Sequence, residues 1–518
     1  MKIRAKASGK GENMKQFDIQ FFSKNQRTIL LFIFLLEMVS FLTFLFTPET
    51  PAMSYIFLIL IGITFIISLI NIKYGLFIVL TELLIGSQGY LFFYNFNDNV
   101  ISIRIGLFCV VMLAWFIWLI RSNSYRLVYD FFKNNVELLY LAGVLLMGLI
   151  SAFVFGNELR NIFFDFNNWI FFLYILPFVT VLRKQKHLNE IVQLIIVGVS
   201  ALAVKSLAFL FLFSHPSEMI GSIYSWGRDT GFGEFTVITG NLYRIFSQGQ
   251  IWAIVIFFVS IGYLIFKGTK EYRIKGNKYL SIVVLLLLTT IILSLSRSFW
   301  VGLFCAGIVL LLTGIFFYKF RVKAVSLIVL KLGVLILISF TLITLVINFP
   351  VGGSSFTDPS SLITKRLDLG ESAVSSRWSQ LPALGRAIGK NPVFGSGWGT
   401  TVEYQSHDPR IVTEENPDGW YTTYAFEWGY LDFVLKIGIV GVMAYLFVFY
   451  KILSRFYILW KTKQDHFYRA LVVGLILGFI ALLCVHGFTP YLNHPLGIGY
   501  IILCYVFIQL LDQGEINK

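Results

Sequence analysis

Residues 279–317 read YLSIVVLLLLTTIILSLSRSFWVGLFCAGIVLLLTGIFF, and this stretch decides the fold class. Two apolar runs lie on either side of a short polar turn, and Arg297 is the only charged residue in the stretch. A helix needs about 20 apolar residues to cross about 30 Å of hydrocarbon. The stretch therefore predicts two membrane-spanning helices joined by a tight turn.

The composition extends this prediction to the whole chain. Of its 518 residues 57% are hydrophobic and 14% are charged, and the mean hydropathy is +0.76. Soluble domains carry about 25% charged residues and about 45–50% apolar ones. A soluble or disordered protein is therefore excluded. The apolar runs are continuous and do not alternate with period two, which excludes a transmembrane β-barrel.

Fourteen apolar runs predict an all-α, polytopic membrane protein with about 12–14 transmembrane helices. The predicted spans are 28–46, 53–71, 75–94, 104–120, 136–155, 167–182, 191–214, 250–266, 279–296, 299–317, 326–348, 427–450, 468–488 and 492–511. The predicted organisation is a basic cytoplasmic tail (1–27), helices 1–11 (28–348), a large extracytoplasmic loop (349–426), helices 12–14 (427–511) and a cytoplasmic tail (512–518).

The basic residues set the orientation. Most of the 42 Lys and Arg fall in the termini and in alternate short loops, as the positive-inside rule expects of cytoplasmic segments. Both termini are therefore predicted to be cytoplasmic, and the long loops at 215–248 and 349–426 to be external. The net charge of +14 follows this topological pattern and does not indicate a nucleic-acid partner. The tail 1–27 has no apolar core and is not a signal peptide.

The large external loop contains a predicted helix. Ser375 and Ser376 are candidate caps, and the apolar residues Trp378, Leu381, Leu384, Ala387 and Ile388 recur at helical spacing. The helix should end at Asn391-Pro392, before the glycine-rich run Phe394–Gly399. We expect an amphipathic helix on the outer membrane surface.

Three external arginines are the candidate binding residues. Arg297 lies at the outer boundary of the hydrocarbon, Arg244 just precedes a span, and Arg377 opens the loop helix. Arginines at such places either anchor the chain at lipid headgroups or bind a phosphate with both guanidinium nitrogens.

Two carboxylates begin the span at 427–450. Asp432 and Lys436 are four residues apart, which predicts an ion pair on one helix face. Glu427 has no partner at helical spacing inside the span and is suited to act as a general base.

Other polar residues are weaker candidates for a catalytic, binding or metal site. Glu37, Glu82 and Lys205 are intramembrane charges that could form an ion pathway or pair between helices. His486 and His494 lack a third metal ligand, and the four cysteines lie in apolar runs without metal-ligand spacing. We expect no metal and no cofactor.

Four segments resemble the O-antigen ligase and O-antigen polymerase superfamily of bacterial envelope glycosyltransferases. They cover roughly the C-terminal 280 residues, and their order, spacing and external placement carry the resemblance. The segments are Tyr243–Ser247, Leu295–Leu303, Arg377–Gly399 and Glu427–Gly441.

The resemblance implies a GT-C-type helical enzyme of the bacterial inner membrane that acts at the outer face on a polyprenyl-diphosphate-linked glycan. Arg244, Arg297 and Arg377 would hold the donor diphosphate, and Glu427 would deprotonate the acceptor hydroxyl. Trp398, Tyr421 and Tyr430 would stack on sugar rings or belong to the interfacial aromatic belt. The resemblance also admits a chain-length regulator and a flippase as partners, beside the lipid bilayer.

The chain departs from the family at its proposed base. The family often places a histidine before Asn-x-Tyr-Leu, where this chain has Glu427 and Trp428. This difference favours a polymerase of undecaprenyl-diphosphate-linked repeat units over a ligase. The alternatives are a ligase that transfers glycan to a lipid or protein, and a flippase or exporter that uses Glu37, Glu82 and Lys205.

A conservative substitution tests the role of Arg297. We expect Arg297→Lys not to rescue Arg297→Ala, because an ammonium lacks the planar fork that binds a diphosphate with two hydrogen bonds. The length of the polymer made by each variant is the measurement, and full-length polymer from the Lys variant would contradict the clamp.

Overall fold

The computed structural model describes residues 24–46, 51–96, 99–215, 217–239, 242–266, 277–349, 372–406, 408, 411–413, 415–463 and 465–512. Most of the predicted basic tail, the predicted C-terminal tail after Asp512 and part of the large external loop (350–371) lie outside the described residues.

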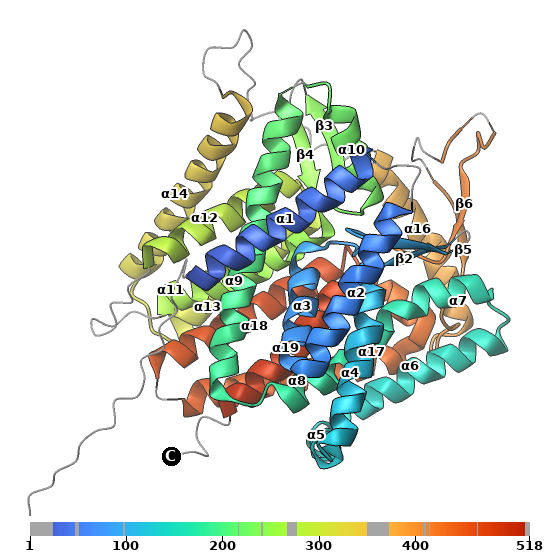
Figure 1. Ribbon diagram of the computed structural model, residues 1–518, viewed down its shortest axis with the longest axis horizontal. Coiled ribbons are helices and arrows are strands. Elements are labelled where there is room, and N and C mark those ends of the chain that lie inside the picture. Colours follow the sequence, from blue (N-terminus) through green and yellow to red (C-terminus); the bar gives the residue numbers. More distant parts are fainter. Residues whose placement is uncertain are drawn as a thin grey trace, which may run out of the picture.

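Helices dominate the chain, and the predicted all-α polytopic class is confirmed (Figure 1). Twelve helical stretches of the described chain are long and apolar enough to cross a membrane. The helices of the first half are α1 (Lys24–Phe46), α2 (Ala52–Ile70), α3 (Ile72–Ile85), α4 (Ile103–Arg121), α5 (Tyr125–Asn134), α6 (Val136–Val154), α7 (Leu159–Phe166), α8 (Ile175–Val181), α9 (Gln185–Ser214) and α10 (Ile220–Asp229), with a 3-10 helix at Asn167–Tyr174. Those of the second half are α11 (Ile251–Phe266), α12 (Asn277–Ser294), α13 (Arg297–Phe316), α14 (Val322–Ile347), α16 (Ser372–Lys390), α17 (Gly429–Thr462), α18 (His466–His486) and α19 (Pro495–Asp512), with a 3-10 helix at Gln248–Gln250.

Two predicted spans are shorter than expected. The span predicted at 75–94 ends as a helix at Ile85, so α3 has 14 residues. At 1.5 Å per residue such a helix is about 21 Å long, which is less than the hydrocarbon thickness. Where the remaining helical turns of this span were predicted, the chain instead leads into a β-hairpin at residues 93–102. The apolar part of α12, Tyr279–Ser294, is also below the length of a span.

Three two-stranded antiparallel hairpins interrupt the helices in the part of the chain that the structure describes. They are β1 (Phe93–Phe96) with β2 (Asn99–Ser102), β3 (Glu234–Thr239) with β4 (Leu242–Phe246), and β5 (Val402–Gln405) with β6 (Trp420–Thr423). The last two lie in the two segments predicted to be external. In them Thr236 pairs with Arg244 and Tyr404 pairs with Tyr421. The hairpins thus set the positions of two candidate site residues.

The most buried spans are α19, α11 and α9, followed by α18, and they form the centre of the bundle. Helices α11 and α18 approach closely where Gly262 faces Gly474, because a Cβ on either glycine would meet the backbone of the other helix. Small residues permit this kind of close helix packing in membranes. Helices α1 and α14 expose most of their surface at the periphery, where their apolar side chains can face lipid.

The helix predicted in the large loop is present as α16. It begins at Ser372, before the predicted caps Ser375 and Ser376. Its apolar face packs on the protein: Ala383 and Leu384 are buried in one cluster with Tyr404 of β5 and Leu435 of α17. The face expected to lie on the membrane therefore has a protein partner, which anchors the helix beside the start of α17.

Helix α17 is broken at Gly438, whose φ of 65° and ψ of −172° are non-helical. The chain segment after α16 fills the break. The N–H groups of Ile439 and Val440 donate to the carbonyl oxygens of Pro392 and Val393, at 2.9 and 3.2 Å. The carbonyl oxygens of Leu435 and Lys436 accept from the N–H groups of Ser396 and Gly397, at 2.7 and 3.0 Å. Backbone groups released by a broken span must be paired inside the protein, and here they are.

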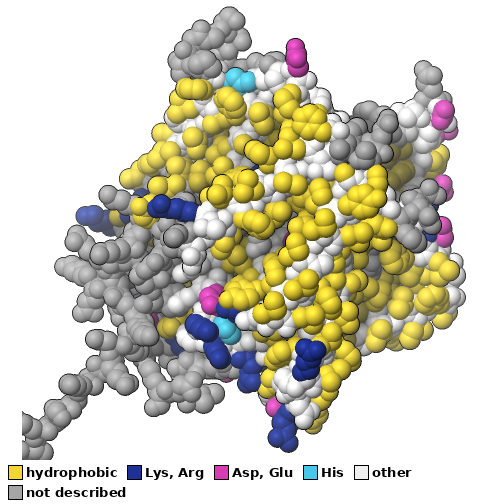
Figure 2. All heavy atoms as spheres, viewed as in Figure 1, with side chains coloured by type: hydrophobic (Ala, Val, Ile, Leu, Met, Phe, Trp, Pro, Cys, Tyr) yellow, Lys and Arg dark blue, Asp and Glu magenta, His cyan; other side chains and the backbone are white. Residues whose placement is uncertain are grey.

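Charged side chains separate along the molecule (Figure 2). On the face shown, much of the Lys and Arg lies around α5 and the start of α9, and Asp and Glu lie largely at the opposite end, near β3 and near the β5–β6 hairpin. The segments 121–135 and 183–190, predicted to be cytoplasmic, lie at the basic end, and the orientation itself stays a prediction.

The break in α17 predicts a selective requirement for glycine. An alanine at 438 would adopt a backbone conformation that only glycine tolerates, and its Cβ would meet the Val393 carbonyl group. We expect Gly438→Ala to lower the free energy of unfolding by about 1–3 kcal/mol. Unfolding by SDS titration of the protein in mixed micelles measures this change.

The control is Gly333→Ala in α14, where a Cβ would have no neighbour within 4 Å. We expect it to be neutral or stabilising, because alanine favours a helix more than glycine does by about 1 kcal/mol. Equal stability of the two variants would contradict the role assigned to Gly438.

Candidate functional site

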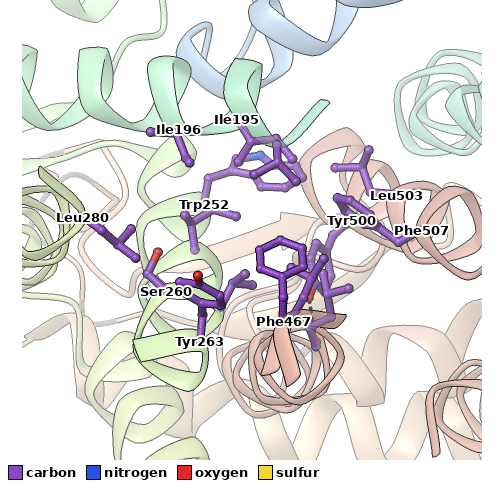
Figure 3. A pocket seen from close by; sticks show the side chains of 15 residues that line it. Ile195, Ile196, Trp252, Ser260, Tyr263, Leu280, Phe467, Tyr500, Leu503 and Phe507 are labelled. Atoms are coloured by element: carbon purple, nitrogen blue, oxygen red, sulfur yellow. Dashed lines mark hydrogen bonds between the residues drawn. The ribbon is translucent and has the colours of Figure 1, made fainter. Parts of the chain in front are cut away.

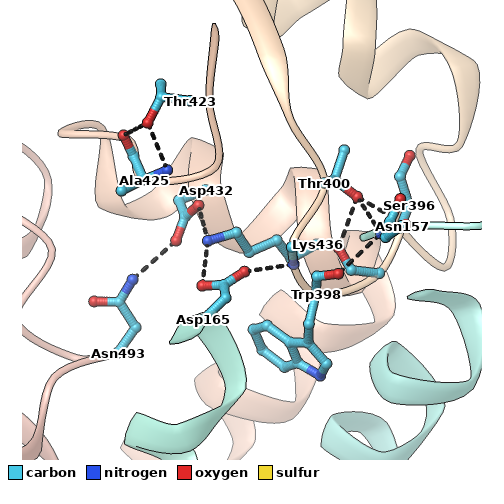
Figure 4. Close-up of polar contacts among 12 residues, drawn as sticks. Asn157, Asp165, Ser396, Trp398, Thr400, Thr423, Ala425, Asp432, Lys436 and Asn493 are labelled. Carbon is cyan, nitrogen blue, oxygen red and sulfur yellow. Dashed lines mark hydrogen bonds and ion pairs between the residues drawn. The ribbon is translucent and has the colours of Figure 1, made fainter. Parts of the chain in front are cut away.

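A buried ammonium group joins three segments near the start of α17. Lys436 Nζ lies 2.7 Å from Asp165 Oδ1 of α7 and 2.7 Å from Asp432 Oδ1, one turn earlier on α17 (Figure 4). All three side chains are less than 10% exposed. The predicted Asp432–Lys436 ion pair is confirmed, and Asp165 joins it from a distant part of the chain.

The other carboxylate oxygens also have partners. The N–H of Gly399 donates to Asp165 Oδ2 at 2.8 Å, and the Asn493 amide donates to Asp432 Oδ2 at 2.8 Å (Figure 4). A buried charge is tolerated when it is paired and hydrogen-bonded. The three charged side chains, called here the Asp–Lys–Asp cluster, therefore tie α7, α17, the glycine-rich run and the 487–494 turn together.

The glycine-rich run packs with its backbone directly against helices. Gly395, Gly397 and Gly399 have φ values of 76°, 84° and 74°. A Cβ on each would meet backbone atoms of α17, α6 and α7 respectively. The side-chain nitrogen of Asn157 lies 3.0 and 2.9 Å from the carbonyl oxygens of Ser396 and Trp398. The run is thus a fixed ribbon between three helices.

Trp398 is a core residue. Its side chain is 0% exposed, its indole N–H donates to the Leu145 carbonyl at 3.0 Å, and its ring lies 4.8 Å from that of Trp169. No ring face is open to a sugar in this structure. The predicted stacking of Trp398 on a sugar ring is therefore not supported. The sequence could not show this, because a tryptophan beside glycines can face either the core or solvent.

Arg244 and the turn that carries Arg297 are in direct contact. Arg244 Nε donates to the carbonyl of Ser294 at 2.8 Å, its guanidinium lies 4.6 Å from the Phe246 ring centre, and Glu234 lies 3.7 Å away. Arg297 is the first residue of α13 and is partly buried. The Arg244 guanidinium therefore contacts the tight turn from which Arg297 begins a helix, and the dipole at that helix end favours an anion.

Arg377 and Glu427 form a second pair. They are joined by an ion pair, with side chains 36% and 47% exposed. The Trp428 indole N–H donates to the Arg377 carbonyl at 3.0 Å, which fixes α16 next to the start of α17. Helix α17 begins at Gly429. Glu427 therefore precedes the span and does not lie within it, and its partner comes from the loop helix.

The turn at 487–494 connects the two groups of candidate residues. Phe488 packs on Trp428 with ring centres 5.7 Å apart, and Thr489 Oγ1 donates to Ser298 Oγ at 2.9 Å. Burial lowers the pKa of His494 to about 3, so this imidazole is neutral at physiological pH and accepts a hydrogen bond from the Leu496 N–H at 3.3 Å. The turn is thus a fixed bridge between α13 and α17.

The remaining candidates have structural contacts. Tyr430 is 38% exposed, and its hydroxyl donates to the Leu483 carbonyl at 2.8 Å. His486 accepts from the Leu492 N–H at 3.1 Å. The intramembrane charges invoked for a transporter are paired between helices, Lys205 with Glu37 at 2.5 Å and Arg104 with Glu82 at 2.9 Å.

An apolar cavity lies apart from these residues. Its volume is about 60 Å³, and its lining includes Trp252, Tyr263 and Tyr500 between α9, α11, α18 and α19 (Figure 3). The lining has no charged side chain. This cavity is too small and too apolar for a diphosphate or a sugar.

Sequence reasoning missed Asp165 and Asn157. Asp165 is flanked by Phe163, Phe164 and Phe166, and a lone carboxylate among such apolar residues signals a buried partner. Asn157 follows directly after an apolar run and a glycine, a place that looks like an ordinary loop. Its contacts depend on residues about 240 positions away.

Comparison with known proteins supports the resemblance. Residues 282–446 match the family model Wzy_C, described as O-antigen ligase. Comparisons with curated proteins and with solved structures give no match. The matched range contains Arg297, Arg377 and Glu427, and Arg244 lies before it. The superfamily resemblance is thus confirmed over this range, which together with the spans supports a membrane-bound enzyme that transfers glycans.

The Asp–Lys–Asp cluster makes a stability prediction. Lys436→Met would leave two buried carboxylates without their cation, and we expect a loss of about 3–5 kcal/mol in the free energy of unfolding. Lys461→Met is the matched control, because Lys461 is exposed on the same helix, and a change within about 0.5 kcal/mol is expected. SDS-titration unfolding measures both, and similar stabilities for the two variants would refute the role of the cluster.

Proposed function

We propose that this chain, with its O-antigen ligase match, is a polymerase that joins undecaprenyl-diphosphate-linked repeat units at the outer face of the bacterial inner membrane. Arg244 and Arg297, with Arg377, would bind the donor diphosphate. Glu427 would take the proton of the acceptor hydroxyl. The observation that carries the proposal is the contact between Arg244 and the Arg297 turn at the amino end of α13.

The reaction is a displacement at the anomeric carbon of the donor sugar. The acceptor oxygen forms the new glycosidic bond, the bond from that carbon to the diphosphate oxygen breaks, and its electron pair leaves with the polyprenyl diphosphate. Glu427 accepts the proton of the acceptor hydroxyl. Preorganised cations stabilise the charge that develops on the leaving group, so the arginines supply the stabilisation for which other enzymes use a metal ion.

The Arg377–Glu427 ion pair suggests how the base is exposed. In this structure the Arg377 guanidinium and the Glu427 carboxylate are paired with each other. A diphosphate carries more negative charge than one carboxylate and binds guanidinium with two hydrogen bonds. Donor binding near Arg377 would therefore compete with Glu427 and leave its carboxylate available for the acceptor.

A ligase is the second candidate, because the matching family model is itself described as O-antigen ligase. A ligase would use the same donor residues with another lipid or protein acceptor. We favour the polymerase because Glu427 and Trp428 stand where the ligase pattern has histidine and asparagine. Transport by a flippase or exporter is less favoured, because Glu37, Glu82 and Lys205 are held in ion pairs between helices.

Purified protein with lipid-diphosphate-linked repeat units, without nucleotide and with EDTA, tests the proposal on a gel. We expect a polymer ladder from the wild type. Arg297→Ala should slow transfer by about 10²–10³-fold, as loss of one charge-stabilising donor does, and Glu427→Gln by about 10²–10⁴-fold, as loss of a general base does.

The matched controls are Glu403→Gln on the exposed face of β5 and Arg121→Ala at the end of α4. Both should keep the wild-type rate. Transfer to a separate acceptor without a ladder would mean a ligase. No transfer with any acceptor, or full activity in both site variants, would overturn the glycosyltransferase site proposed here.

A further inference from the structure

A polar cleft lies between the α6–α7 connection and the residues that precede α17. Its volume is about 500 Å³, within the range of small-molecule sites. One wall is the connection between α6 and α7, and the other is β6 with the residues that follow it. Its polar lining includes Glu158, Asn161, Thr401, Tyr421, Thr422 and Tyr424.

The lining has the chemistry that recognises sugars. It offers hydroxyl groups from Thr and Tyr, which both donate and accept, and the amide group of Asn161. Tyr421 is 41% exposed and combines an apolar ring with a hydroxyl group. Burial raises the pKa of Tyr424, which keeps its hydroxyl protonated and able to donate. Sugar rings present the complementary hydroxyl groups and apolar faces.

The charge of the lining selects among sugars. Of the ten described residues that line the cleft, Glu158 is the only charged one. Arg160 and Lys436 act electrostatically on Tyr424 from outside this lining, and Lys436 is paired with two carboxylates. Its carboxylate accepts from the Asn161 amide at 3.2 Å. A uronic acid or a phosphate would meet this carboxylate without a compensating cation from the lining, and like charges repel. The cleft is therefore suited to uncharged hexoses or N-acetylhexosamines.

The floor of the cleft is rigid. Gly399 is held by Asp165, and the Asn157 amide is held by the carbonyl groups of the glycine-rich run. The pairing of Tyr404 with Tyr421 fixes the β6 wall. A site that is already ordered loses less entropy when a ligand binds.

The cleft adjoins the proposed base rather than the proposed diphosphate site. Its last lining residue, Tyr424, is three positions before Glu427. The Ala425 N–H donates to Thr423 Oγ1 at 3.1 Å, which fixes the turn between them (Figure 4). From Trp428 the contacts then continue through Phe488 and Thr489 to Ser298, next to Arg297. Glu427 is thus between the cleft and the arginines in this series of contacts.

We propose that this cleft binds uncharged sugar residues of the acceptor glycan and presents the acceptor hydroxyl to Glu427. The assignment to the acceptor rests on the proposed function, but the binding of sugar by the cleft does not. Tyr421 and Asn161 would be direct sugar contacts, and Glu158 would exclude acidic sugars.

Binding of glycan without lipid or diphosphate tests the cleft separately from catalysis. The probes are oligosaccharides released from the surface polysaccharides of the source cells by partial acid hydrolysis and divided into uncharged and acidic pools by anion exchange. The full-length protein in lipid nanodiscs is titrated with each pool, and native mass spectrometry measures the bound fraction.

We expect the wild type to bind members of the uncharged pool, and Tyr421→Ala with Asn161→Ala to weaken this binding at least tenfold. Both side chains are at the surface, so their truncation leaves the core intact. Trp420→Ala is the matched control, because Trp420 is an exposed aromatic residue of the same strand outside the cleft. It should bind as the wild type does.

Other outcomes overturn the proposal. They are equal binding by the double variant and the wild type, binding of the acidic pool alone, or no binding of either pool by the wild type. Arg297→Ala distinguishes the two proposals: it should bind the uncharged pool normally. If Arg297→Ala also made full-length polymer, the proposed diphosphate site would be contradicted, while the sugar-binding role of the cleft would still be supported.

Discussion

The site depends on one buried ammonium group. Lys436 Nζ is shared by Asp165 and Asp432, and neither carboxylate could be left in a protein interior without it. Because Asp165 also accepts from Gly399 and Asp432 from Asn493, the position of Lys436 fixes the glycine-rich run and the 487–494 turn together. The cleft and the Arg377–Glu427 pair are both built on these segments. A hydrophobic replacement could fill the space but could not orient four hydrogen-bonding partners.

The break in α17 makes this arrangement possible. A continuous helix would pair the carbonyl groups of Leu435 and Lys436 with its own N–H groups. At Gly438 the helix is interrupted, and these carbonyl groups instead accept hydrogen bonds from the N–H groups of Ser396 and Gly397. The glycine-rich run can therefore enter the bundle without unpaired backbone groups, which a membrane interior does not tolerate. Its glycines are needed for close approach to three helices, so this part of the third segment of the family resemblance is mainly a packing device.

The sequence predicted what depends on local spacing. The apolar runs predict the spans, the four-residue interval predicts the Asp432–Lys436 pair, and the periodicity at 378–388 predicts α16. What it could not predict depends on contacts between distant segments. Asp165 lies 271 positions from Lys436, Arg377 meets Glu427 only after α16 packs on α17, and the burial of Trp398 depends on α6. The shortened α3 was missed because apolar residues resume at residues 90–94 after the short polar break at residues 86–89, which marks the true end of the helix.

These contacts place opposite electrostatic requirements on the two sides of Glu427. A leaving diphosphate needs positive potential, which Arg244 and Arg297 would supply in the proposed site at the amino end of α13. An acceptor hydroxyl needs a base that is not neutralised, which requires that cations be kept away from it once the donor is bound. The proposed cleft, lined by an amide, hydroxyls and Glu158, would meet this second requirement, and the charge of nearby Lys436 is balanced by two carboxylates. The Arg377–Glu427 pair is where the two sides meet, so an exchange of partners there would couple donor binding to activation of the acceptor.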